Sequence, residues 1–180
     1  MSVKGFGYAA DVASRELDTV DTILGQWRAV RPDLDVSAIG VIGRVSRFSR
    51  LIDQRLEENF AGFGIEAWMF DVLATLRRSG EPFALTAGAL VRQAMITTGA
   101  MTNRIDRLVD RGLVERASAD DRRRVMVQLT PVGFDLVETV VEAHLATERE
   151  ILSSLSPRQQ RDLAAMLRTS LLAFGDRPAD

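Results

Sequence analysis

Apolar residues recur every three or four positions along most of this chain, a spacing that predicts amphipathic helices. Two of the helices have clear start signals, because Thr130 and Ser156 each place a capping hydroxyl directly before a proline. The stretches with helical spacing cover residues 14–30, 37–60, 66–78, 131–155 and 157–174. The pattern therefore predicts a mainly helical protein.

The centre of the chain has shorter elements and stronger turn signals. Thr86 and Thr97 are suited to begin helices, and Gly112 is suited to end one. The predicted elements are a very short strand at 83–85, helices at 87–93 and 97–111, and strands at 114–116 and 125–129. Helix, turn, helix and hairpin thus follow one another.

The composition fits a globular protein and excludes several kinds of chemistry. The chain has 180 residues, 46% of them hydrophobic, and no apolar stretch approaches the roughly 20 residues that a membrane-spanning helix needs. It has no cysteine and one histidine, His144, so disulfides and cysteine-bound metals are excluded. No nucleophile–base pair, phosphate loop or metal-ligand set is visible. We therefore expect a cytoplasmic protein that is not an enzyme and has no metal, cofactor or membrane partner.

Charge is unevenly distributed along the chain. The net charge is −2, yet the segment from Arg92 to Arg124 has eight basic and five acidic residues, which leaves a net of −5 for the rest. This asymmetry is typical of a segment that faces a polyanion. The alternative is an ordinary solvated face, because Lys4 is the only lysine and arginine is the usual cation of this chain.

The predicted helix at 97–111 combines an apolar face with a face of small polar residues. Small hydroxyl and amide groups allow a helix end to approach base edges closely, and an arginine can reach a phosphate or a guanine. The candidate DNA contacts on this helix are Thr98, Gly99, Thr102, Asn103 and Arg107. An ordinary surface helix is the alternative, since Asp106 and Asp110 lie on the same face.

The predicted hairpin has three consecutive arginines, Arg122, Arg123 and Arg124, at its tip. They repel one another unless they are paired, and they have little use in packing. At the tip of a β-wing they can enter a minor groove or bind phosphates. The alternative is a solvated turn in which Asp120 and Asp121 pair with the arginines.

Residues 38–137 resemble the winged helix-turn-helix core of MarR-type transcriptional regulators. The resemblance rests on a D-x-R-x-x-x-x-x-L-T pattern from Asp121 to Thr130 and on the run R-L-V-D-R-G-L-V from Arg107 to Val114. It implies a homodimer on a pseudo-palindromic operator in double-stranded DNA. It also implies N-terminal helices including a dimerisation helix at 1–60, a DNA-binding domain at 61–130 and C-terminal dimerisation helices at 131–180.

Within this family, the chain is most similar to the urate-responsive PecS- and HucR-like branch. The similarity lies in an additional N-terminal helix with a tryptophan and in the residues at 70–73 and 99–104. It implies four ligand-binding residues, Trp27, Asp71, Arg104 and Arg116, and a small anionic effector. Urate is the first candidate, and citrate or trans-aconitate is the nearest alternative.

The same four residues also have structural interpretations. Trp27 can be a packing residue between helices, Asp71 and Arg104 can form a purely structural pair, and Arg116 can be an ordinary strand residue. A charge at Arg104, beside the core face of its helix, needs a partner in either case. The sequence thus predicts a ligand-responsive repressor, with a winged-helix protein–protein adaptor that lacks ligand control as the alternative.

Overall fold

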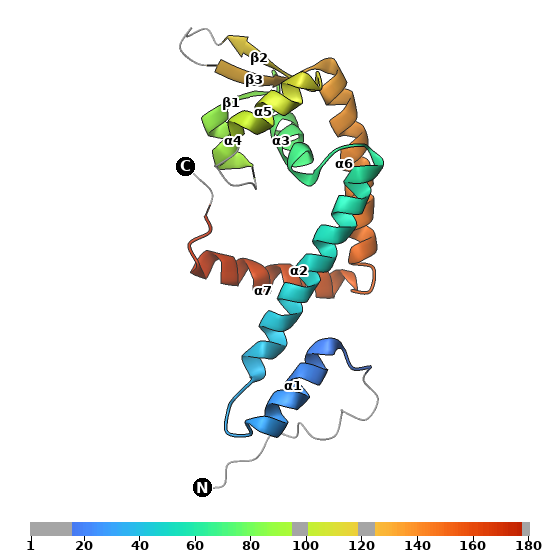
Figure 1. Ribbon diagram of the computed structural model, residues 1–180, viewed down its shortest axis with the longest axis vertical. Coiled ribbons are helices and arrows are strands. Elements are labelled where there is room, and N and C mark those ends of the chain that lie inside the picture. The colour runs from blue at the N-terminus through green and yellow to red at the C-terminus, as the bar shows by residue number, and fades with distance from the viewer. Residues whose placement is uncertain (1–15, 95–100, 119–124, 178–180) are drawn as a thin grey trace. The chain divides into compact units, whose positions relative to one another are not determined.

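The structure, a computed structural model, describes residues 16–94, 101–118 and 125–177. Helices predominate, and three strands form a small sheet (Figure 1). The elements are α1 (Thr19–Val30), α2 (Ser37–Gly62), α3 (Ala67–Arg78), β1 (Ala84–Thr86), α4 (Ala87–Gln93), α5 (Met101–Asp110), β2 (Val114–Ser118), β3 (Val125–Leu129), α6 (Pro131–Ile151) and α7 (Pro157–Ala173). The mainly helical class with a small antiparallel sheet is thereby confirmed.

Several boundaries differ from those that the sequence predicted, most of them by one or two residues. Helix α1 begins at Thr19 rather than at residue 14, because the Asp18 side chain accepts the amides that open it. Helix α6 ends at Ile151 rather than at 155, and a short turn then leads to the Ser156 cap of α7. Strand β2 continues to Ser118, two residues beyond the prediction.

The chain divides into two compact units, residues 1–52 and 53–180. In the first unit, Val20 and Leu24 of α1 form a small cluster with Val36, the residue before α2, and with Ile39 of α2. Close approach is possible because α2 has a glycine at the contact: a Cβ on Gly43 would lie only 3.2 Å from Val20 Cγ1. The absence of a side chain at Gly43 thus allows α1 to pack closely on α2.

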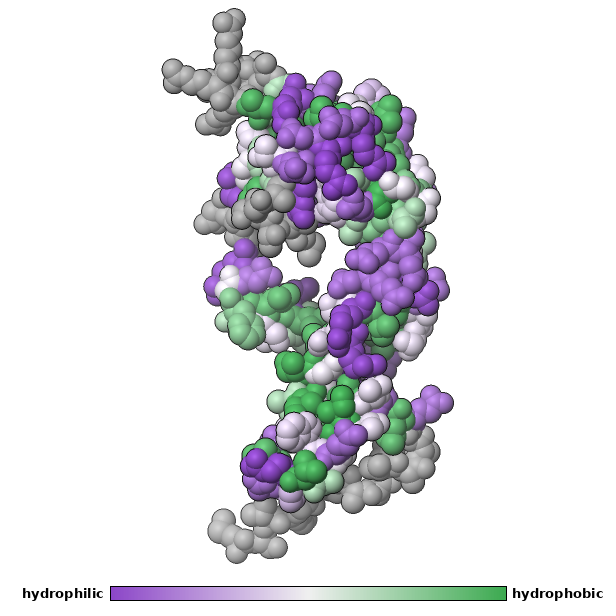
Figure 2. All heavy atoms as spheres, in the orientation of Figure 1, coloured by the Kyte–Doolittle hydropathy of each residue, from purple (hydrophilic) through white to green (hydrophobic). Residues whose placement is uncertain are grey.

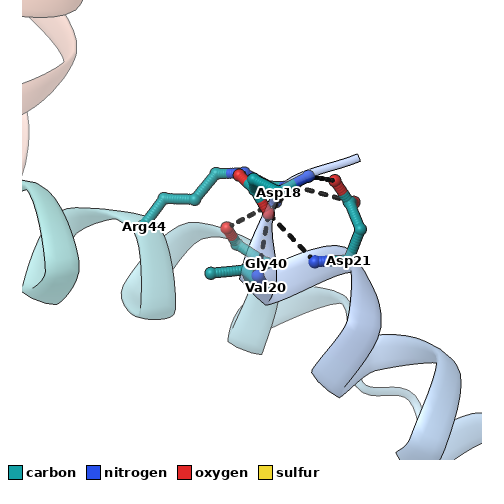
Figure 3. A network of polar contacts seen from close by, with 5 residues as sticks. All are labelled: Asp18, Val20, Asp21, Gly40 and Arg44. Carbon is teal, nitrogen blue, oxygen red and sulfur yellow. Dashed lines mark hydrogen bonds and ion pairs between the residues drawn. The ribbon is translucent and has the colours of Figure 1, made fainter. Parts of the chain in front are cut away.

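A polar network holds the beginning of α1 on α2 (Figure 3). The Arg44 guanidinium lies 2.8 Å from a carboxylate oxygen of Asp18 and 2.8 Å from one of Asp21. Asp18 also caps α1, and Asp21 completes the capping box. The hydrogen bond from Arg44 holds the pKa of Asp21 below its ordinary value.

In the second unit, the strands form an antiparallel sheet in the order β1-β3-β2. The sequence predicted the β2–β3 hairpin and a very short strand at 83–85; the structure has this strand, β1, one residue later and pairs its Leu85 with Val127. The core that α3, α4, α5 and α6 build with this sheet includes the fully buried Leu73, Leu76 and Leu108. This packing fixes the positions of α5 and the described parts of the hairpin.

The junction between α5, β2 and α6 depends on two glycines and a threonine. Gly112 adopts φ +65°, which suits the turn after α5. Thr130 donates to the Gly112 carbonyl at 2.7 Å and accepts from the Gly133 amide at 3.0 Å. A Cβ on Gly133 would lie 1.9 Å from the Leu113 carbonyl oxygen, so only glycine fits here.

Arg77 of α3 binds the base of the sheet to α6. Its Cζ lies 5.1 Å from the Phe83 ring centroid and 4.9 Å from that of Phe134. Its Nε donates to Glu138 Oε1 at 2.6 Å. A guanidinium over two rings and beside a carboxylate ties three elements together.

Each unit also leaves large apolar side chains exposed. None of the side chains of α7, all of which the structure describes, is buried. Figure 2 shows hydrophobic residues on the surface of α7, whereas hydrophilic residues cover much of the winged-helix part. The exposed apolar residues of the first unit are Leu17, Ile23, Trp27, Val30, Leu34, Val41, Ile42, Val45, Phe48 and Leu51, and those in or directly after α7 are Met166, Leu167, Leu171, Leu172 and Phe174. No helix in the described ranges is long and apolar enough to cross a membrane.

Candidate nucleic-acid interface and effector residues

Helix α5 has the two faces that the sequence predicted. Met101, Ile105 and Leu108 are buried in the core. Thr102 and Asn103 are exposed at the beginning of the helix. Their hydroxyl and amide groups are therefore available to base edges or phosphates.

Five of the expected DNA contacts lie outside the described residues. They are Thr98 and Gly99 before α5, and Arg122, Arg123 and Arg124 between β2 and β3. Their roles stay predictions from the sequence. The described flanks of the hairpin, β2 and β3, pair from Val114 with Leu129 to Ser118 with Val125.

Arg107 is exposed on α5, but its guanidinium already has two partners. They are Trp68 of α3 and Glu66, the residue directly before α3. One nitrogen forms an ion pair with Glu66, and Cζ lies 4.8 Å from the centroid of the Trp68 ring. The Trp68 indole donates to the second oxygen of Glu66 at 2.7 Å. The hydrogen bonds from Trp68 and Arg107 hold the pKa of Glu66 below its ordinary value, so the carboxylate is charged at neutral pH.

Sequence reasoning did not identify Glu66 and Trp68 as partners of Arg107. Glu66 precedes Arg107 by 41 residues, so no local spacing indicates the pair. A second arginine, Arg111, donates to the Gly64 carbonyl and contacts Met69 Sδ, both at 3.0 Å. Arg107 of α5 and Arg111, directly after that helix, thus both contact the start of α3 or the residues just before it.

The guanidinium of Arg104, an expected effector residue, lies against an aromatic ring. Its Cζ is 5.5 Å from the Trp68 centroid. Its Nη1 is buried and has no hydrogen-bond partner among the residues that the structure describes. A buried charged donor needs an acceptor, and the described residues do not supply one for this atom.

The other expected effector residues are in different surroundings. Asp71 is partly buried on α3, and its pairing with Arg104 stays a prediction. Arg116 is exposed on β2 and lies 2.5 Å from Asp106 of α5, an ion pair that joins the helix to the wing strand. Trp27 lies on α1 in the other compact unit, and its side chain is partly exposed. The effector roles of all four residues stay predictions.

Comparison with known proteins places this architecture in a family. Residues 63–124 match a family model described as the MarR family. The chain is 45% identical over 149 residues to the HTH-type transcriptional regulator PecS of Dickeya dadantii (strain 3937). The aligned residues cover 82% of this chain and 90% of that relative.

Two solved structures of regulators share the fold. A cysteine-to-serine variant of Escherichia coli MarR, complexed with operator DNA, matches with a TM-score of 0.64 at 25% identity, covering 81% of this chain and 97% of that chain. Bordetella bronchiseptica BpsR, whose DNA binding is regulated by 6-hydroxynicotinic acid, matches with a TM-score of 0.65 at 26% identity, covering 78% and 94%. These relatives are DNA-binding regulators rather than enzymes, as the sequence predicted. The chain belongs to the MarR family of winged-helix transcriptional regulators.

Proposed function

We propose that this protein is a cytoplasmic, ligand-responsive repressor that binds a pseudo-palindromic DNA operator as a homodimer. The observation that carries the proposal is α5, which is held by a buried apolar face and exposes Thr102 and Asn103 beside the predicted wing. The relatives support it, since a MarR structure contains operator DNA. In this proposal, α5 enters the major groove, and Arg122, Arg123 and Arg124 bind phosphates or the minor groove.

The exposed apolar surface supports a homodimer. A helix such as α7, without any buried side chain, is not stabilised by packing within one chain. A second copy that covers α7 and the exposed residues of α1 and α2 would bury this surface. In this proposal, two-fold symmetry relates the two recognition helices, and we expect them to lie about one duplex turn apart, as a palindromic site requires.

The surroundings of Arg104 support a planar anionic effector. A carboxylate or a urate oxygen could accept from the buried Nη1, and the indole of Trp68 is already in contact with the guanidinium. BpsR is regulated by 6-hydroxynicotinic acid, which is also a small planar acid. We therefore propose urate or a related anion, with citrate or trans-aconitate as the alternative. The ligand releases DNA if it binds the DNA-incompetent arrangement more tightly.

Selection of bound fragments from random duplexes tests the DNA-binding part and identifies the operator. Urate and citrate are then titrated against the complex of the wild type and of Arg104→Ala. We expect one of the anions to release the wild-type complex and to have no effect on the variant. Release that persists in Arg104→Ala, or no response to either anion, would contradict the effector site. If no duplex is enriched at low salt, the protein–protein adaptor replaces the repressor as the better account.

A further inference from the structure

The exposed recognition-helix arginine is already paired with a carboxylate in the free protein. Arg107 and Glu66 form an ion pair in which both side chains are about half exposed, at 49% and 54%. A carboxylate and a phosphate make the same kind of charge-assisted hydrogen bond to a guanidinium. The Glu66 carboxylate therefore occupies a place on Arg107 that a DNA phosphate oxygen would also take.

The Glu66 side chain does not cap the helix that it precedes. It stands at the N-cap of α3, yet its side chain makes no hydrogen bond to the amides of that helix, all of which are described. Its two oxygens instead accept from Arg107 and from the indole of Trp68. The Trp68 ring also lies under the Arg107 guanidinium, so the tryptophan orients both members of the pair.

The attachment of α5 does not rest on this pair alone. Arg111 donates to the Gly64 carbonyl one helical turn further along. Met101, Ile105 and Leu108 anchor the same helix in the core. Arg107 can therefore leave Glu66 without displacing α5.

We propose that Glu66 is an internal competitor of DNA for Arg107, which lowers the DNA affinity of the free protein and is displaced when the operator binds. The proposal rests on the DNA-binding function proposed above. Because both side chains are about half exposed, replacing Glu66 by a DNA phosphate on Arg107 changes the free energy little. We therefore expect Glu66 to lower the DNA affinity by only a few fold.

Fluorescence anisotropy with a labelled operator duplex tests the competition. Glu66→Gln keeps the size of the side chain and removes its charge, and we expect it to bind DNA about three- to tenfold more tightly. The matched control is Asp110→Asn, which removes a charge from α5 at a residue for which the described part of the chain shows no ion pair. We expect the control to change affinity less than about twofold. In an Arg107→Ala background, Glu66→Gln should give no increase.

Trp68 provides a second readout. The chain has two tryptophans, so Trp27→Phe leaves Trp68 as the single tryptophan. Saturating operator DNA should change its emission, because Arg107 leaves the ring and Glu66 loses a partner, and the change should be smaller in Glu66→Gln.

Unchanged or weakened DNA binding by Glu66→Gln, with an unaltered melting temperature, would overturn the competition. So would an equal gain in the Arg107→Ala background or in Asp110→Asn. Failure of the wild type to bind any duplex is a different result, since it removes the DNA-binding function itself.

Discussion

The winged-helix core and the helices that flank it show the same hydrophobic periodicity but differ in what covers it. Leu73, Leu76 and Leu108 of the core have no exposed surface, whereas Leu171 of α7 is 52% exposed. A stripe of apolar residues thus predicts a helix in both regions, but it does not indicate whether the covering surface comes from the same chain. In the core it does, and in the flanking helices we expect it to come from a second copy.

Disrupting α7 should have the largest effect. Leu171→Asp places a charge on the exposed apolar face of α7, where we expect the second copy to pack. The expected result is a monomer at micromolar concentration in sedimentation velocity. Because a single half-site contact replaces two, operator affinity should fall about a hundredfold or more.

The control for this prediction is Val132→Asp, at another exposed apolar position, the start of α6. We expect it to leave the protein dimeric. A Leu171→Asp protein that sediments as a dimer would show that α7 is not part of the interface.

A matched pair of leucine-to-alanine changes sharpens the comparison. Leu73→Ala leaves a cavity in the core and should lower the free energy of unfolding by about 3 kcal/mol at any protein concentration. Leu171→Ala should lower the stability only through the dimer, so its effect should depend on protein concentration. Denaturant unfolding at two concentrations measures both. Concentration-independent losses of similar size for the two variants would remove the distinction between the regions.

Base recognition by α5 should produce a smaller and more local effect. Asn103→Ala should cost about 1–3 kcal/mol and relax the preference at one base position in each half-site, because an amide can read adenine. Competition binding with operators that differ at single positions measures this. If affinity falls equally for all sequences, Asn103 contacts the backbone rather than a base.

Acid should weaken the attachment of α1 by the smallest amount. The hydrogen bond from Arg44 lowers the pKa of Asp21 in the folded protein. The stability that the charged Asp21 contributes is therefore fully present above the unfolded pKa of 3.8, and it is lost as the pH falls through the lower folded pKa. Hydrogen exchange of the α1 amides should show reduced protection below about pH 4, and Arg44→Ala should reduce it at neutral pH.

The matched control for the acid effect is Arg50→Ala. Arg50 lies on the same helix and donates only to the Ser46 carbonyl among the contacts that the structure shows. Equal loss of protection in the two variants would mean that the ion pairs of Arg44 do not hold α1.

Local signals in the sequence predicted most elements of the fold, and long-range contacts account for what they missed. Thr86, Thr130 and Ser156 cap helices as their positions predicted, because capping depends on a few neighbouring residues. The pairing of β1 with β3 was not predictable from a strand of three residues, since its partner lies some forty residues away. In contrast, helical periodicity correctly predicted the polar face of α5.

The partners on that face depend on tertiary structure. Helical periodicity predicts that Arg107 is exposed, but it does not predict the ion pair with Glu66. The alternation of residues likewise places Arg116 on a strand, but it does not predict the ion pair with Asp106. Arg104 is the residue for which sequence and structure agree most closely: both indicate a charge beside the core that needs a partner.

The salt dependence of operator binding tests the central claim most directly. Affinity is measured by fluorescence anisotropy from about 50 to about 300 mM salt for the wild type and for Arg122→Ala combined with Arg123→Ala. A dimeric DNA-binding regulator predicts a linear fall of log K with log salt, and the loss of four wing arginines per dimer should reduce the slope by roughly 2–4. Binding that does not depend on salt, or no binding to duplex at low salt, would contradict the account.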